Sequence, residues 1–165
     1  METAYIGLGG NLGDRALLLG QAVRALAVTP GVEVRACSSL YETAAVGPPQ
    51  PDYLNAVLVV RTSLEPAALL ESLRGLERAA GRERRERWGP RTLDADLLLY
   101  GERVVDEPGL AVPHPELHRR RFVLEPLSEV APWAVHPVLA RTVDELLRQL
   151  PEGGVVRYAP PPVLP

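Results

Sequence analysis

The order in which alternating and helical apolar patterns follow one another limits most strongly what this chain can fold into. Four short apolar runs predict β-strands, at residues 3–9, 32–43, 53–62 and 93–101. Apolar residues at helical spacing predict one helix over 15–28 and a second that begins at Pro66. The predicted order is therefore β-α-β-β-α-β.

This order is typical of the ferredoxin-like α+β fold, in which helices pack on one face of an antiparallel sheet. Segments rich in Gly and Pro predict loops at 44–52 and 81–92. A C-terminal extension is expected to hold a short strand over 102–106, a helix over 142–150 and a proline-rich tail over 159–165. We expect one domain over residues 1–165, although this fold serves many unrelated functions.

Composition excludes several classes of protein. The chain has 165 residues and a net charge of -3, so it has no overall basic field for nucleic acid or for an anionic membrane. The N-terminus lacks the pattern of a signal peptide, and no apolar stretch approaches the roughly 18 residues of a membrane span. The single cysteine, Cys37, suits a reducing compartment, so we expect a cytoplasmic protein.

Two acidic residues open the fourth predicted strand. Asp94 and Asp96 lie two positions apart, so both should point to one face, while Ala95 and Leu97 point to the other. Adjacent carboxylates repel each other, so a cation or nearby arginines should neutralise them. Oxygen ligands without cysteine favour Mg²⁺, which usually completes its shell with phosphate oxygens and water. A structural cluster of salt bridges remains the alternative.

An arginine cluster precedes these acids in the sequence. It comprises Arg82, Arg84, Arg85, Arg87 and Arg91. The forked guanidinium group suits phosphate oxygens, whereas in many proteins such a run is only a solvated face. Beside a pair of carboxylates that could hold Mg²⁺, the cluster favours binding of a polyphosphate.

Other side chains suggest a pocket for a flat ring. Trp88 could stack on such a ring or could belong to the core, and Tyr53 and Asn55 share one face of a predicted strand. His114 lies between two prolines, on a predicted loop. Together these residues indicate a phosphoryl-type transferase with a small heterocyclic acceptor. An RNA-binding module and a structural domain without activity are the rival interpretations.

Five segments carry a resemblance to a known family. They are YIGLGGNLGDR, SSLYET, PDYLNAV, RWGPRTLDADLLLYG and VPHPELHRRRFVLEPLSEVAP, which occur in the family's order and cover most of residues 4–132. The chain resembles the 6-hydroxymethyl-7,8-dihydropterin pyrophosphokinases of folate biosynthesis. The resemblance implies a ferredoxin-like fold and transfer of the β,γ-pyrophosphoryl group of ATP to the pterin hydroxymethyl oxygen, which releases AMP.

The resemblance also implies roles for particular residues. The expected pterin-binding residues are Thr43, Ala44, Ala45, Val46, Tyr53, Asn55, Trp88, Asp94 and Phe122. The expected nucleotide-binding residues are Glu77, Arg84, Arg87, Trp88, Arg91, Leu97, His114 and Arg120. The expected catalytic residues are Arg82, Arg84, Arg91, Asp94 and Asp96, of which Asp94 and Asp96 hold two Mg²⁺ ions.

The mechanism expected from these residues is direct in-line attack on the β-phosphorus of ATP. Arginines stabilise the transferring group, and the sequence offers no evident nucleophile for a covalent intermediate. Either Asp94 accepts the hydroxyl proton or a metal ion acidifies the hydroxyl. ATP and the pterin are the expected partners of a monomer that binds neither nucleic acid nor membrane.

Overall fold

The computed structural model of the protein describes residues 1–81 and 92–164. Its strands are β1 (Glu2–Gly10), β2 (Val32–Cys37), β3 (Leu40–Thr43), β4 (Tyr53–Thr62), β5 (Asp94–Tyr100), β6 (Val105–Glu107), β7 (Leu110–Val112), β8 (Val135–His136), β9 (Arg141–Thr142) and β10 (Val155–Ala159). Its helices are α1 (Arg15–Ala27), α2 (Pro66–Ala79), α3 (Arg121–Val130) and α4 (Val143–Arg148), with a 3-10 turn at Leu117–Arg119.

One antiparallel sheet forms the centre of the molecule. It runs β10-β3-β4-β1-β5, and β2 also pairs with β4, beyond the end of β3. The hairpins β6-β7 and β8-β9 are separate from it. Among the described residues β5 is therefore an edge strand of the main sheet, joined to β1 on one side only.

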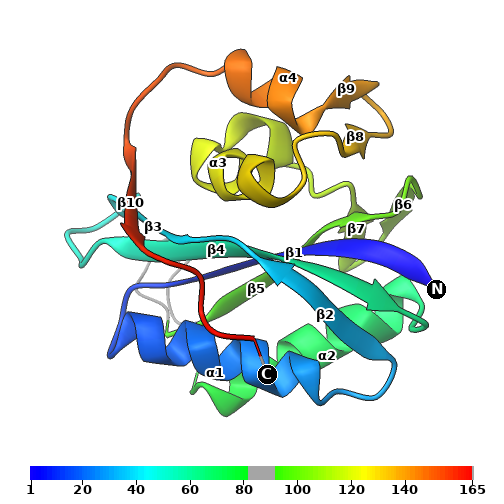
Figure 1. The fold of residues 1–165 in the computed structure, drawn as a ribbon, viewed down its shortest axis with the longest axis horizontal. Helices are drawn as coiled ribbons and strands as arrows, with labels where there is room; N and C mark the ends of the chain where they lie inside the picture. The colour runs from blue at the N-terminus through cyan, green and yellow to red at the C-terminus, as the bar shows by residue number, and fades with distance from the viewer. Residues whose placement is uncertain (82–91, 165) are drawn as a thin grey trace.

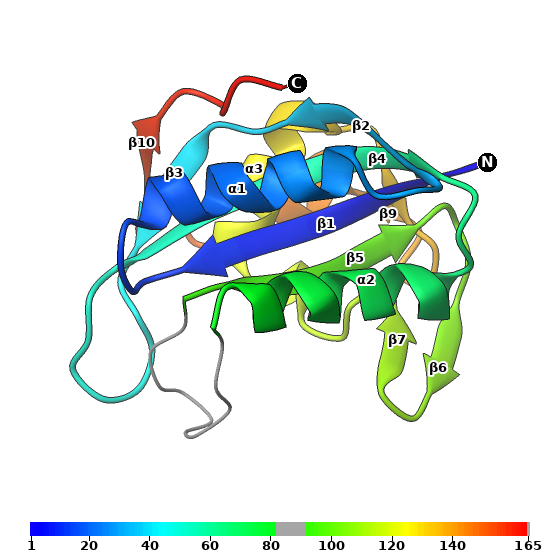
Figure 2. The same ribbon diagram turned by 90° about the horizontal axis from the view of Figure 1, so that it is seen from below.

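Helices cover both faces of this sheet (Figure 1). The helices α1 and α2 lie side by side on one face, whereas α3 and α4 lie over the other (Figures 1 and 2). Each face buries its own apolar cluster: Ile6 and Leu73 belong to the first, and Val57 and Leu124 belong to the second. The predicted α+β class is confirmed, and so is the placement of the two predicted core helices on one face.

The prediction of a single strand over 32–43 is wrong, because this segment forms two strands, β2 and β3. Ser38 interrupts the ladder: its backbone N–H donates to the carbonyl of Val57, while its hydroxyl accepts from the Val57 N–H at 2.9 Å. A side-chain oxygen thus takes the place of a backbone carbonyl at this point. Both β2 and β3 pair with β4, so the predicted order of strands and helices is kept despite the interruption.

The region after β5 contains more structure than the sequence pattern predicted. The strand expected over 102–106 occurs as β6, which begins at Val105. The helix expected over 142–150 occurs as the shorter α4, which begins at a capping box formed by Thr142 and Glu145. The strand β10 extends the main sheet beyond β3, and α3 was not predicted. Pro126 lies inside α3, which explains why no helix was expected there.

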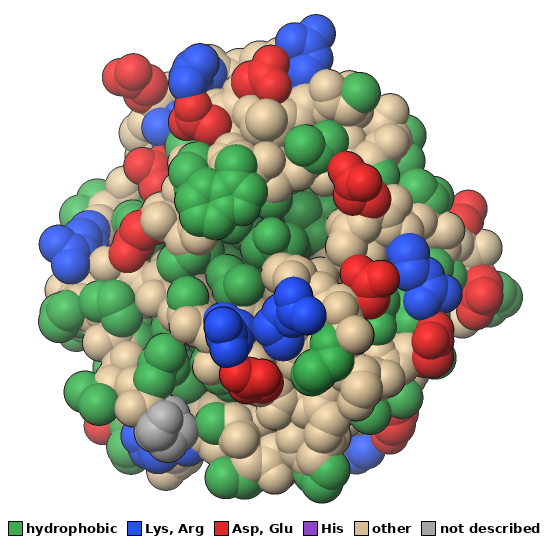
Figure 3. Space-filling model, turned by 45° about the vertical axis from the view of Figure 1, so that its right-hand side comes forward, with side chains coloured by type: hydrophobic (Ala, Val, Ile, Leu, Met, Phe, Trp, Pro, Cys, Tyr) green, Lys and Arg blue, Asp and Glu red, His purple; other side chains and the backbone are tan. Residues whose placement is uncertain are grey.

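None of the described helices is long and apolar enough to cross a membrane. One face of the molecule is hollowed, and apolar side chains gather in the hollow, with charged side chains beside it (Figure 3). Several large apolar side chains around the β8-β9 hairpin are exposed, Trp133 most of all at 69%.

Candidate active site

The two acids lie at the start of β5, as the alternation predicted. Ala95 and Leu97 turn into the core that α1 and α2 cover, so Asp94 and Asp96 share the opposite face, and both are only partly buried. Each acid is paired with a glycine of β1, Asp94 with Gly9 and Asp96 with Gly7. Neither glycine places a side chain beside its acid, although the Leu98 side chain lies over Gly7.

The same glycine connects the acids with the expected pterin-binding residues. Gly9 is paired with Asn55 of β4 on one side and with Asp94 on the other, so all three face the same side of the sheet. Two strand spacings separate Asn55 from Asp94, which is about 10 Å. A Cβ atom at Gly9 would come within 2.9 Å of Asn55 Oδ1. The Asn55 amide oxygen therefore lies against Gly9, which carries no side chain of its own. We call the Gly9 backbone between Asn55 and Asp94 the bare floor.

Buried polar groups line the β4 side of this floor. The Asn55 amide donates a hydrogen bond of 3.0 Å to the Thr43 hydroxyl, and Thr43 is paired with Tyr53 across β3 and β4. Ala44 and Val46 are exposed on the loop that follows, and Ala45 is half-buried. Asn11 is buried and donates to Gln50 and to the carbonyl of Pro51 at the far end of that loop. The loop is thereby attached to the end of β1.

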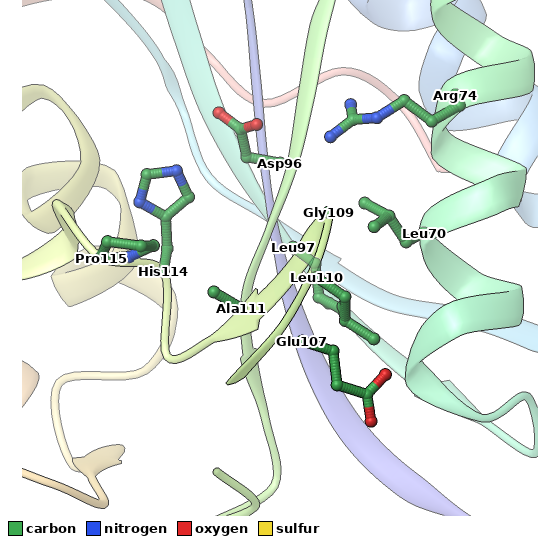
Figure 4. Close-up of a pocket in the computed structure, with 10 residues that line it drawn as sticks. All are labelled: Leu70, Arg74, Asp96, Leu97, Glu107, Gly109, Leu110, Ala111, His114 and Pro115. Carbon is green, nitrogen blue, oxygen red and sulfur yellow. The ribbon is translucent and has the colours of Figure 1, made fainter. Parts of the chain in front are cut away.

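A cavity of about 270 Å³ lies beside Asp96 (Figure 4). Residues of α2, β5 and the β6-β7 hairpin line it, together with the segment that follows β7. The lining residues are Leu70, Arg74, Asp96, Leu97, Glu107, Gly109, Leu110, Ala111, His114 and Pro115. Asp96 thus belongs both to the face that carries the acids and to the cavity, where Arg74 and His114 approach it from opposite sides (Figure 4).

His114 is fixed from two directions. Its backbone N–H donates to the carbonyl of Leu98 on β5, and its Nδ1 accepts from the N–H of Glu116 at 3.1 Å. Burial lowers the pKa of His114, the Asp96 carboxylate opposes this shift, and the Arg120 guanidinium adds to it. The ring is therefore neutral near pH 7, with Nδ1 as acceptor and Nε2 carrying the proton.

Arg120 and Phe122 stand at the beginning of α3, the helix that packs against β3 and β4. The Arg120 guanidinium lies over the Phe122 ring, 5.6 Å from its centroid. This cation–π contact joins an expected nucleotide-binding residue with an expected pterin-binding one. Both residues thus stand at the start of a helix that lies over the face of the sheet that carries the acids.

Comparison with known proteins identifies the family of this chain. The model of the family described as 7,8-dihydro-6-hydroxymethylpterin-pyrophosphokinase (HPPK) matches residues 5–132. The chain belongs to this family.

Relatives support this membership over most of the chain. The 2-amino-4-hydroxy-6-hydroxymethyldihydropteridine pyrophosphokinase of Synechocystis is 46% identical over 157 residues, which are 95% of this chain and 80% of that protein. The protein of the same name from Methylorubrum extorquens is 44% identical over 158 residues, which are 95% of this chain and 99% of that protein.

Among solved structures, wild-type Plasmodium falciparum HPPK-DHPS with pteroate has a TM-score of 0.72 at 15% identity. The match covers 90% of this chain but only 44% of that one, so this chain spans less than half of the solved structure's length. At so low an identity the likeness concerns the fold.

Some residues that the HPPK resemblance implied lie outside the described part of the chain. They are Arg82, Arg84, Arg87, Trp88 and Arg91, and Arg85 of the same cluster lies there too. Glu77 was expected to bind nucleotide. Its carboxylate is buried and accepts a hydrogen bond of 3.0 Å from the backbone N–H of Ala95.

The structure adds site residues that sequence reasoning missed. Gly9 and Arg74 border the acids, and Leu110 and Ala111 of β7 line the cavity. The spacing of Leu70 and Arg74, four residues apart, could have indicated one helix face toward the cavity. No local sequence pattern indicates that the β6-β7 hairpin lines the cavity, because the position of the hairpin depends on packing between distant segments.

Proposed function

We propose that this chain transfers the β,γ-pyrophosphoryl group of ATP to the hydroxymethyl oxygen of 6-hydroxymethyl-7,8-dihydropterin, in the biosynthesis of tetrahydrofolate. The products are AMP and the pterin diphosphate. The observation that carries the proposal is the position of Asp94 and Asp96, between a bare floor edged by Asn55 and a cavity edged by His114. Membership of the HPPK family supports the same reaction.

The pterin is proposed to lie over Gly9, with its polar edge toward Asn55 and Thr43. Burial of both side chains supports this, since buried amides and hydroxyls recognise a heterocycle most selectively when water is excluded. Tyr53 and Phe122 are proposed to supply aromatic contacts. Three loop residues, Ala44, Ala45 and Val46, are proposed as the outer wall of the pocket, and Trp88 as a further ring contact.

The nucleotide is proposed to occupy the cavity, with its phosphates directed to Asp96. Leu97 and the β7 residues, which line the cavity, would bound its apolar part. His114, which also lines the cavity, and Arg120, whose charge acts on His114, would face the phosphates. A neutral His114 that carries its proton on Nε2 is a hydrogen-bond donor for a phosphate oxygen. We further propose phosphate contacts from Arg82, Arg84, Arg87 and Arg91.

Asp94 and Asp96 are proposed to hold two Mg²⁺ ions together with the ATP phosphates. Among residues 1–81 and 92–164 no group of three or more His, Cys, Asp or Glu side chains could hold a metal ion. A pair of carboxylates fits Mg²⁺, because this ion takes one or two protein carboxylates when substrate phosphates and water supply the other ligands. When bound, the ions would neutralise phosphate charge and align the phosphate chain.

The residues around the acids support a direct displacement. The pterin oxygen would form its bond to the β-phosphorus as the bond from that phosphorus to the oxygen of AMP breaks. The proton of the hydroxymethyl group would pass to Asp94, the carboxylate nearer to the proposed pterin floor. Arg120 would stabilise the charge that moves onto the phosphate oxygens.

We also propose that the protein acts as a monomer and as a single domain over residues 1–165, in the cytoplasm. The buried free thiol of Cys37 is compatible with a reducing compartment. The net charge of -3 supports small-molecule partners over nucleic acid or an anionic membrane. Sedimentation of the purified chain tests the monomer directly.

A product assay tests the proposed reaction. Purified protein is mixed with ATP, Mg²⁺ and 6-hydroxymethyl-7,8-dihydropterin, and the nucleotides and pterins are separated by chromatography. AMP together with a pyrophosphorylated pterin is expected, whereas ADP would mean transfer of a single phosphoryl group and would overturn the proposal. Asp96→Ala should abolish turnover while the protein stays folded. A loss of stability without loss of turnover would instead indicate a structural carboxylate cluster.

A further inference from the structure

In the part of the chain that the structure describes, the edge of β5 beside the acids has no neighbouring strand. Ala95 is paired with Leu8 of β1, but its own N–H and C=O both bond in the other direction. Backbone groups on a buried sheet edge need partners, because each unpaired group would cost the free energy of a lost hydrogen bond. The partners here are side chains of α2.

Glu77 and Arg74 supply those partners as a connected pair. Glu77 Oε2 accepts from the Ala95 N–H at 3.0 Å, and an Arg74 Nη donates to the Ala95 carbonyl at 2.9 Å. The same Arg74 nitrogen donates to Glu77 Oε1 at 2.9 Å. Glu77 is only 3% exposed, so this contact is largely shielded from water. The two side chains thus act on Ala95 as an adjacent strand would, with one acceptor and one donor.

Ala95 is the residue between Asp94 and Asp96. The direction of each carboxylate depends on the backbone at 94–96, and the β1 side of that backbone faces glycines, which offer no side chain to support the acids. Fixing both polar groups of Ala95 therefore restrains the two acids together. We infer that Glu77 and Arg74 are positioning residues, which hold Asp94 and Asp96 in the orientation that receives the metal–phosphate group.

This inference rests on the proposed function, and it assigns Glu77 a different role from direct contact with the nucleotide. Arg74 also lines the cavity, so both roles must be separated by experiment (Figure 4). A nucleotide contact acts on the affinity for ATP. A positioning pair acts on the geometry of residues 94–96 even when no substrate is present.

The test compares Glu77→Gln with the matched variant Glu71→Gln. An amide at 77 can still accept from the Ala95 N–H, but its NH₂ group faces the Arg74 donor, so the pair must separate. Glu71 also belongs to α2 and forms an ion pair with Arg78 at 2.9 Å, but both side chains of that pair are exposed. The control thus removes one charge and one ion pair from the same helix.

The first readout needs no activity. Amide NMR signals of residues 94–96 are followed while Mn²⁺ alone, a paramagnetic stand-in for Mg²⁺, is added to each protein. Glu77→Gln should shift these signals in the metal-free protein and raise the Mn²⁺ concentration that broadens them by about tenfold, since residues that orient metal ligands typically act on this scale. Glu71→Gln should match the wild type in both respects.

The second readout is the Mg²⁺ dependence of turnover at saturating ATP. Glu77→Gln should raise the Mg²⁺ concentration for half-maximal rate and lower kcat, with KM for the pterin unchanged. If Mn²⁺ broadens the same signals at the same concentrations in Glu77→Gln and wild type, and only KM for ATP rises, the pair contacts nucleotide and the inference is overturned.

Two further outcomes keep this inference separate from the proposed reaction. If the wild type makes no pyrophosphorylated pterin but the Mn²⁺ series differs as expected, the reaction is wrong and the positioning role stands. If Glu77→Gln does not fold, Arg74→Met with Glu77→Leu replaces the partly buried ion pair by apolar side chains of similar size. A folded double variant whose Mn²⁺ titration equals that of the wild type also overturns the inference.

Discussion

The amide of Asn55 donates a hydrogen bond of 3.0 Å to the hydroxyl of Thr43, and both side chains are buried at the edge of the proposed pterin floor. This bond uses one N–H of the Asn55 side chain. It thereby fixes the plane of the side-chain amide, and with it the directions of the second N–H and of Oδ1. A ligand over Gly9 therefore meets an amide that is oriented before it arrives. Orientation of this kind lowers the entropic cost of binding.

Replacing Thr43 by valine tests this arrangement. The variant keeps the shape of the side chain but removes the acceptor, so the Asn55 amide loses its restraint. We expect KM for the pterin to rise about tenfold, the equivalent of one hydrogen bond of about 1.4 kcal/mol, with KM for ATP unchanged. Steady-state kinetics measure both constants. The control is Ser72→Ala, which removes a hydroxyl that donates to the Ala68 carbonyl within α2. It should change neither KM for the pterin nor KM for ATP.

Gly9→Ala tests whether the bare floor is required. The added methyl group would stand 2.9 Å from Asn55 Oδ1 and 3.4 Å from the carbonyl oxygen of Leu54. We expect the pterin to lose measurable binding by calorimetry and the free energy of unfolding to fall by about 1–3 kcal/mol.

Gly75→Ala is the matched control for that variant. Gly75 lies inside α2, where the nearest atom to an added Cβ would be the Arg78 guanidinium at 3.9 Å. Alanine should raise the free energy of unfolding by about 0.5–1 kcal/mol, because glycine is a poor helix former. Unaltered pterin binding in Gly9→Ala would show that the ligand does not lie over β1.

The part of the site that could be predicted from the sequence is the part that depends on local periodicity. Strand alternation places Asp94 and Asp96 on one face whichever strands flank them, and the same holds for Tyr53 and Asn55. The roles of Gly9 and Ala95 could not be predicted in this way. They arise from the register of β1 against β4 and β5, which joins residues that are far apart in the sequence.

In the fold, too, features set by local pattern could be predicted, and features set by distant contacts could not. The order β-α-β-β-α-β follows from local patterns, but the break at Ser38 depends on a hydrogen bond to Val57, nineteen residues away. The helix α3 was missed because Pro126 and the arginines before it conceal its apolar stripe. Packing against α4 and against β3 and β4, which are distant from it in sequence, stabilises it.

Glu129 of α3 gives a test of that packing. Its carboxylate accepts from the N–H and the hydroxyl of Ser39 and, at 2.6 Å, from the hydroxyl of Tyr41. Burial of Tyr41, with Glu129 beside it, raises the pKa of that phenol. Glu129→Ala leaves the buried N–H of Ser39 without this acceptor, so the free energy of unfolding should fall by about 2 kcal/mol in urea titrations.

An exposed ion pair serves as the comparison for Glu129. Glu33 forms a salt bridge of 2.5 Å with Arg35, and both side chains are more than half exposed. Glu33→Ala should lower the free energy of unfolding by less than about 1 kcal/mol. Equal losses in the two variants would mean that Glu129 does not anchor α3 to the sheet.

His136 predicts how stability depends on pH. It is 6% exposed, and its Nδ1 accepts from the N–H groups of Val138 and Leu139, which requires an unprotonated nitrogen. Burial, together with His118 nearby, lowers the pKa of His136. Below the unfolded value of about 6.5 the unfolded chain therefore binds more protons than the folded one, so stability is complete above that pH and falls as the pH drops through it.

The variant His136→Asn separates this effect from other titrations. An asparagine Oδ1 can accept from the same two N–H groups but does not titrate between pH 5 and 8. We expect the urea midpoint of the wild type to fall between pH 7.5 and 5.5 more steeply than that of the variant. The variant keeps a residual slope from His114, whose pKa burial also lowers. Parallel curves for the two proteins would show that His136 takes up its proton without loss of its hydrogen bonds.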